Sequence, residues 1–203
     1  MRSILTLRAG TLAIIASVAA TPALAQRSTT RGFHIGAHLQ GASLTVEDDD
    51  PVEGGGLGLR VGYGFNRRFM GYLEADGIVF DVENPDLEGE WTMAHADLGV
   101  RYHFANSLRR WVPFLDAAVG ARAVSVEDAT SEGEDVGKVT FSGGAFSLGG
   151  GVSFFTSEKF ALETLVKFTG GTFEQVDVGD VSVRNLDIDA SSFRFKLGLS
   201  WWP

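Results

Sequence analysis

Large apolar residues alternate with small or polar ones along most of the chain from residue 31 onward. In the last run, Phe195, Leu197 and Leu199 occupy one parity, whereas Lys196 and Gly198 occupy the other. Because successive side chains of a β-strand point to opposite faces, this period of two predicts strands with one apolar and one polar face. Eight runs follow the pattern, at 33–40, 57–65, 72–79, 94–104, 115–122, 146–154, 162–168 and 193–201.

The connections between these runs alternate in length. Long connections fall at 46–54, 81–90, 127–138 and 170–190, and short ones fall at 66–68, 105–110 and 156–159. An up-and-down barrel in a membrane has short turns on one side and long loops on the other. Most runs approach the roughly 9–11 residues that a tilted strand needs to cross the hydrocarbon layer. We therefore predict an all-β fold, an eight-stranded antiparallel up-and-down transmembrane β-barrel with both chain ends on the short-turn side.

The alternation alone does not decide which face points inward. A soluble lipocalin-like barrel also has eight up-and-down strands, but its apolar face surrounds a ligand. Three features favour the lipid-facing arrangement: a glycine-rich polar parity that suits a narrow lumen, the regular alternation of connection lengths without a following helix, and aromatic residues near strand ends. These aromatic residues are Tyr63, Phe65, Phe69, Tyr102, Phe104, Trp111, Phe154, Phe155, Phe160, Trp201 and Trp202.

The first 25 residues are predicted to be a cleavable signal peptide. Arg2 and Arg8 precede the apolar stretch 12–20, and Pro22 follows it before the sequence Ala-Leu-Ala at 23–25. A charged start, a short apolar core and a small-x-small ending are typical of export signals. The apolar stretch is also too short to span a bilayer comfortably. The predicted organisation is a signal peptide at 1–25 followed by one outer-membrane barrel domain at 26–203.

Charge separates the two ends of the predicted barrel. Without Arg2 and Arg8, 15 of the 17 basic residues remain against 26 acidic ones, a net charge of −11. This balance argues against nucleic acid as a partner, because phosphates need basic contacts. Cysteine is absent, which excludes disulfides and thiolate metal sites. The long connections contain 20 of the acidic residues: Glu47, Asp48, Asp49, Asp50, Glu53, Asp81, Glu83, Asp86, Glu88, Glu90, Glu127, Asp128, Glu132, Glu134, Asp135, Glu174, Asp177, Asp180, Asp187 and Asp189.

Basic residues gather at the opposite end. Arg67 and Arg68, Arg109 and Arg110, and Lys159 lie in the three short turns. We therefore expect the chain ends and the basic turns to face the periplasm and the four acidic loops to face the outside of the cell.

The polar parity would bring eleven charged side chains into the lumen. Because an unpaired charge is costly there, we expect a hydrogen-bonded ionic network in a barrel only wide enough for its own side chains. The six cations are Arg60, Arg101, Arg122, Lys167, Arg194 and Lys196, and the five anions are Glu74, Asp76, Asp97, Asp116 and Glu163.

Four histidines, His34, His38, His95 and His103, share the same parity, and we interpret them as polar filling of the lumen. No nucleophile, base and orienting group can be identified together. The acidic loops lack the spacing of a dedicated calcium loop. We therefore predict no catalytic, cofactor-binding or metal-ligating residues, no cofactor, and a protein that is not an enzyme.

Several segments resemble the small outer-membrane β-barrel family that includes OmpA-like, OmpX-like and OmpW-like domains. The resemblance extends over residues 31–203 and rests mainly on the alternation itself. The chain departs from the family's usual aromatic end, because Pro203 follows Trp201 and Trp202. The matching segments are 62–65, 99–104, 149–155, 159–163 and 193–201.

The sequence favours a structural or surface-interaction protein of the cell outer membrane, with a charge-filled lumen and acidic loops. A narrow channel for ions or small solutes is the alternative, and a lipid-modifying barrel enzyme is a second one. The expected partners are outer-membrane lipid, lipopolysaccharide and the assembly machinery, with the protein a monomer. On the lipid face we expect Leu197→Arg to cost about 2–4 kcal/mol, and Gly198→Ser on the lumen face to cost less.

Overall fold

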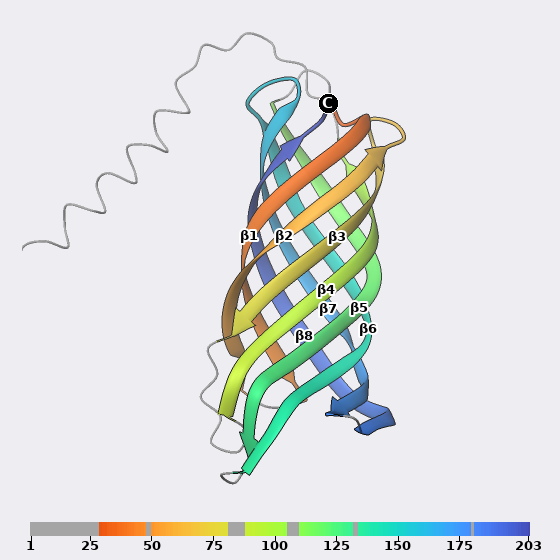
Figure 1. Ribbon diagram of the computed structural model, residues 1–203. Helices are drawn as coiled ribbons and strands as arrows, with labels where there is room; N and C mark the ends of the chain where they lie inside the picture. Colours follow the sequence, from red (N-terminus) through yellow and green to blue (C-terminus); the bar gives the residue numbers. More distant parts are fainter. Residues whose placement is uncertain (1–28, 48–49, 81–87, 105–109, 132–133, 180) are drawn as a thin grey trace, which may run out of the picture.

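The computed structural model describes residues 29–47, 50–80, 88–104, 110–131, 134–179 and 181–203. Eight antiparallel strands follow one another around a closed barrel in chain order (Figure 1). The predicted eight-stranded up-and-down fold is confirmed, whereas the signal peptide at 1–25 lies outside the described residues. The strands are β1 (Gly32–Val46), β2 (Val52–Gly64), β3 (Phe69–Phe80), β4 (Glu88–His103), β5 (Trp111–Ser131), β6 (Glu134–Phe155), β7 (Phe160–Val178) and β8 (Val181–Trp201).

Closure removes the edges of the sheet over the length along which β1 and β8 pair. The first and last strands pair from Ile35 opposite Trp201 to Val46 opposite Ala190. In the described part of the chain, no helix has the length and apolarity required to span a membrane. The C-terminus lies at the same end as the short turns, opposite the long hairpins (Figure 1). This placement follows from an even number of up-and-down strands.

The predicted long loops at 127–138 and 170–190 were wrong in their extent. β5 continues to Ser131 and β6 begins at Glu134, so these two strands form a hairpin almost to its tip. Likewise, β7 ends at Val178 and β8 begins at Val181. Pairing continues beyond the apolar part of the wall because an antiparallel ladder satisfies its own backbone groups, whether lipid or water surrounds it.

The outer wall has the predicted facing in its central band. Apolar residues such as Leu59, Val119 and Leu197 are exposed on the outside, while their chain neighbours are turned inward. Near the short turns, exposed Phe160 and Trp201 stack with ring centres 6.2 Å apart. Two aromatic residues expected in the same girdle, Phe155 and Trp202, instead face the lumen and are fully buried. Each follows an outward-facing aromatic neighbour, and therefore has the opposite parity.

Towards the long hairpins, the two faces exchange their polarity. On β3, the inward positions change from Glu74 and Asp76 to Ile78 and Phe80. On β5, Val124 and Val126 are buried inside while Ser125 lies on the outside. The residues that turn inward at this level form one apolar cluster: Ala42, Leu44, Ile78, Phe80, Met93, Val124, Phe173 and Ala190.

An apolar interior with a polar exterior is the arrangement of a water-soluble β-barrel, whereas the central band has the inverse arrangement of a membrane barrel. Near the long hairpins, most outward residues are small or hydroxylated, with Val79 on β3 as an apolar exception. The small and hydroxylated residues include Gly41, Ser43, Gly77, Ser125, Thr140, Ser142, Gly144, Thr172 and Ser191. In a membrane barrel, such an exchange marks the height of the boundary between lipid and water.

Candidate functional site

The structure brings the eleven predicted lumen charges together inside the barrel. Their side chains are buried, and Glu163 is the most accessible at 11%. Six strands, β2, β3, β4, β5, β7 and β8, supply them from positions of the inward-facing parity. Ten of these side chains form ion pairs with one another: Arg60, Glu74, Asp76, Asp97, Arg101, Asp116, Glu163, Lys167, Arg194 and Lys196.

Glu74 on β3 is the centre of this network. Its Oε1 accepts hydrogen bonds from Lys167 Nζ at 2.6 Å and Lys196 Nζ at 2.9 Å. Its Oε2 accepts a hydrogen bond from the Arg60 guanidinium. Three cations from three other strands thus share one carboxylate, so the network links opposite sides of the barrel.

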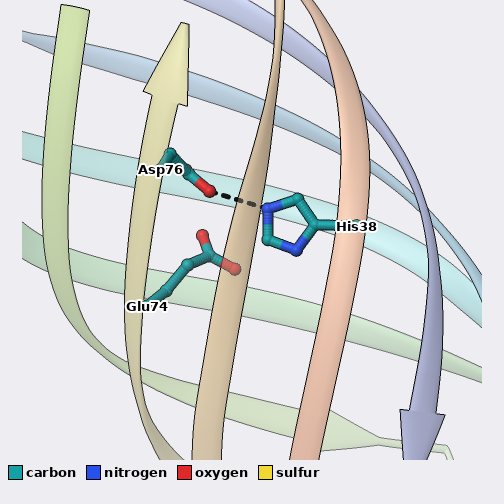
Figure 2. Close-up of side chains that lie close together, drawn as sticks. All are labelled: His38, Glu74 and Asp76. Carbon is teal, nitrogen blue, oxygen red and sulfur yellow. Dashed lines mark hydrogen bonds and ion pairs between the residues drawn. The ribbon is translucent and has the colours of Figure 1, made fainter.

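Asp76 lies on the same face of β3 as Glu74, two residues nearer the long hairpins, and points towards His38 of β1 (Figure 2). Its Oδ1 lies 2.7 Å from His38 Nε2, and its Oδ2 accepts hydrogen bonds from Arg194 and Lys196, both at 2.6 Å. His38 on β1 and Asp76 on β3 are both in register with Gly58 on the intervening β2. A Cβ at Gly58 would collide with both side chains. Glycine at this position therefore allows the two side chains to meet across a strand.

The same three residues, His38, Glu74 and Asp76, are close enough to resemble a metal site, with one potential ligand atom from each within 4.8 Å of the others. However, every carboxylate oxygen already contacts a side-chain nitrogen of histidine, lysine or arginine. A divalent ion would have to displace ammonium and guanidinium groups that are fixed on neighbouring strands. The donor set therefore fits an ionic network better than a metal ion.

A second part of the network lies closer to the short turns. Arg101 forms a bidentate pair with Asp116, at 2.7 and 3.0 Å, and its Nη1 donates to both oxygens of Glu163. Ser153 also donates to Glu163, at 2.9 Å, and His34 Nε2 lies 4.0 Å from the same carboxylate oxygen. This serine, acid and histidine do not form a catalytic relay, because the serine hydroxyl bonds to a carboxylate already held by a guanidinium.

Tyr72 forms an aromatic surface beneath the cations. The Arg60 guanidinium carbon lies 4.7 Å from its ring centre, and Lys167 Nζ lies 5.5 Å from it. A Cβ at Gly99, the cross-strand neighbour of Tyr72, would collide with this ring. The ring therefore fills space that the glycine leaves open, and it is placed to stabilise positive charge by cation–π contact.

Apolar side chains close the lumen on both sides of the network. The cluster at the hairpin end includes Phe80, Met93 and Phe173. At the end with the short turns, Trp202 is 1% exposed, and its ring centre lies 4.6 Å from His34 and 5.9 Å from His103. The other members of this cluster at the short-turn end are Met70, Tyr72, Val112, Ala118, Phe155 and Ala161.

The model of the family described as "Outer membrane protein beta-barrel domain" matches residues 11–200. The chain belongs to this family. The outer membrane is therefore the location of the barrel, and its apolar outer band lies in the lipid.

Solved structures show the same fold at low sequence identity. The surface protein NspA of Neisseria is 15% identical with a TM-score of 0.63, and the match covers 84% of this chain and 96% of that one. The attachment invasion locus protein Ail of Yersinia pestis is 11% identical with a TM-score of 0.54, covering 85% and 100%. OprG of Pseudomonas aeruginosa is 14% identical with a TM-score of 0.54, covering 86% and 97%. No curated relative matches by sequence.

The two apolar clusters that close this outer-membrane barrel were not predicted from the sequence. The sequence does contain a signal for the cluster at the hairpin end, because the inward parity of β3 continues from Asp76 into Ile78 and Phe80. It also contains a signal for the cluster at the short-turn end, because Trp202 has the parity of Ser200 and not that of Trp201. Both signals require the alternation to be followed to the strand ends, beyond the apolar outer band.

Proposed function

We propose that this outer-membrane barrel is a sealed stem that presents its extracellular hairpins to other molecules and carries out no catalysis. The closure of the lumen carries the proposal: an ionic network fills its middle, and apolar clusters centred on Phe173 and Trp202 lie at the two ends. A conducting path would need water to replace these contacts, and an eight-stranded barrel has little room beyond its own side chains.

The β7–β8 hairpin supports a role in contact. Among the described residues, β8 pairs with β1 only from Ala190 onward, so positions 181–184 and 188 pair with β7 alone. Val181 and Val183 in this segment are 65% and 49% exposed. An exposed edge with apolar side chains is a template for adding a further strand from a partner.

The charge of the hairpin end limits the partners that would fit. The described acidic residues at this end include Glu47, Glu53, Glu127, Asp187 and Asp189, all of them exposed. One solved structure of Ail is a complex with sucrose octasulfate, a heparin analogue. A sulfated polyanion would be repelled by the acidic surface of the present chain, and we therefore propose a partner with a basic surface.

Planar-bilayer recording tests the sealed lumen. Refolded protein, with incorporation checked by the different gel mobilities of unboiled and boiled samples, should leave the bilayer at its baseline conductance. Reproducible single-channel steps would overturn the sealed stem and support the channel alternative. The mass spectrum of lipid A should also be the same with and without the gene, and a missing lipid product would support an enzyme.

A retention assay tests the contact role. Cells that carry the protein should be retained on immobilised basic proteins but not on heparin, and cells that lack it should not be retained. The double variant Val181→Lys, Val183→Lys blocks the free edge with charge and should abolish retention. Ser43→Lys, which adds a similar charge on the outer face of β1, is the matched control. Equal retention of all cells, or retention on heparin, would overturn the proposal.

A further inference from the structure

Arg122 on β5 differs from the other lumen cations. Each of the five others pairs with at least one carboxylate, whereas Arg122 forms no ion pair among the described residues. Its side chain is 1% exposed, so water outside the barrel does not solvate it. Arginine keeps its charge in proteins. The lumen therefore contains a buried positive charge that no protein carboxylate balances.

The guanidinium of Arg122 also has unused donors. Nη2 donates to the carbonyl oxygens of Ala190 at 3.1 Å and Gly171 at 3.3 Å. Nε and Nη1 have no hydrogen-bond partner, which leaves three of the five N–H groups unsatisfied. The Phe173 ring, 4.6 Å from the guanidinium carbon, contacts one face of the group. A buried donor without an acceptor is costly, and three on one cation indicate a missing acceptor.

Two neighbouring side chains have the same property. His95 lies opposite Arg122 in the β4–β5 register, and neither of its ring nitrogens has a partner. Ser192 lies two residues from Ala190 on the same face of β8, and its hydroxyl is also buried without a partner. Arg122, His95 and Ser192 are thus buried groups without partners on three strands, β5, β4 and β8.

Neither Asp76 nor Asp97, the carboxylates close to His95 in the strand register, forms an ion pair with Arg122. Asp76, which lies opposite His95 on β3, is held by His38, Arg194 and Lys196. Asp97 Oδ2 pairs with Lys167 and lies 3.6 Å from Arg194 Nη2, whereas its Oδ1, beside Gly120, has no hydrogen-bond partner. The apolar cluster around Phe173 covers the opposite side of the layer. Because neither carboxylate lies within ion-pair distance of Arg122, its three free donors need another acceptor.

We propose that Arg122, His95 and Ser192 bind one small monovalent anion, such as chloride, between the ionic network and the apolar cluster at the hairpin end. A halide accepts hydrogen bonds from several directions and supplies the single negative charge that balances six cations against five carboxylates. A water molecule would satisfy donors but would leave the charge unbalanced. This site does not depend on the proposed contact function, because it lies inside the closed lumen.

Crystals of the refolded protein grown in sodium bromide test the site directly. An anomalous bromide peak is expected beside Nε and Nη1 of Arg122, and it should be absent from crystals of Arg122→Gln. A water-sized peak without anomalous signal would overturn the proposal. A structure in which Arg122 instead pairs with Asp97 would overturn it as well.

Unfolding in detergent micelles gives an independent test that wild-type protein alone can decide. At constant ionic strength, replacing gluconate with chloride should stabilise the wild type, and above the dissociation constant each tenfold rise in chloride should lower the unfolding constant tenfold. Arg122→Gln should lose this dependence, whereas Arg184→Gln, which removes an exposed cation from β8, should keep it. Wild-type unfolding that is the same in chloride and gluconate would contradict a bound anion.

Discussion

The exchange of polarity along the wall predicts that an outward arginine is costly only on the membrane side of the boundary. Leu197 lies at the centre of the outer apolar run of β8, which extends from Phe193 to Trp201. Ser191 faces outward on the same strand, between buried Ala190 and Ser192. The variants Leu197→Arg and Ser191→Arg therefore differ mainly in the height of the arginine relative to the membrane.

The expected difference follows from the strand geometry. Six residues at about 3.3 Å each separate the two positions by about 20 Å along the strand. A tilt of about 40° reduces this to about 15 Å along the membrane normal, beyond the half-height of about 12 Å of the apolar band. Leu197→Arg should therefore cost about 2–4 kcal/mol and Ser191→Arg about 0–1 kcal/mol.

The assay is reversible denaturant unfolding of both variants and the wild type in phosphocholine vesicles. Tryptophan fluorescence and the gel mobility of unboiled samples report the folded fraction. A difference of about 2 kcal/mol corresponds to roughly a thirtyfold change in the unfolding constant. Equal costs at both positions would refute the proposed boundary, and a larger cost for Ser191→Arg would mean that the facing of the wall is reversed.

Three further changes test the lumen and the hairpin. Gly198→Ser should destabilise the protein more than Gly41→Ser in the same unfolding assay, because a Cβ at Gly198 would lie 2.6 Å from a backbone oxygen, whereas nothing lies within 4 Å at Gly41. Glu74→Gln should cost about 3–5 kcal/mol by unfolding in vesicles, since it removes the charge that balances three buried cations. Ser182→Ala should raise the pKa of Asp177 in an NMR titration, because hydrogen bonds from Ser182 and Gln175 hold that pKa below its usual range.

Each of these has a clear contrary outcome. Equal effects of serine at Gly198 and Gly41 would mean that the neighbouring strand moves freely, and a neutral Glu74→Gln would mean that the network does not depend on its central carboxylate. For Asp177, the depressed pKa stabilises the hairpin at pH values above the usual pKa, and this contribution is lost as the pH falls through the folded-state pKa. An unchanged titration in Ser182→Ala would remove the hydrogen bond as its cause.

The structure adds to the expectation for Gly198. The alternation places Gly198 on the lumen face, where a serine is expected to cost less than an arginine on the lipid face. The structure places the carbonyl of Ala37 and the Cβ of His38 within 3.0 Å of an added Cβ. The distance between strands depends on the coiling of the whole sheet, and a single strand does not reveal it.

The sequence by itself determined the number and order of the strands, because period-two alternation and turn residues are local properties. It also determined which parity faces the lumen in the central band, and therefore which charges and histidines lie inside. Residues such as Leu197 and Arg194 could be assigned to their faces without any partner. The hairpins beyond the membrane were predicted less well, because their strands lack an apolar outer face to mark them.

Only the tertiary structure decided which groups meet. Glu74 and Lys196 are 122 residues apart, and their contact depends on the register of every strand between them. The inward turn of Trp202 likewise matters only because the barrel closes around it. The sequence shows an excess of one cation over the carboxylates of the lumen, but the position of that charge at Arg122 follows from barrel geometry, since it depends on which carboxylates the other five cations reach.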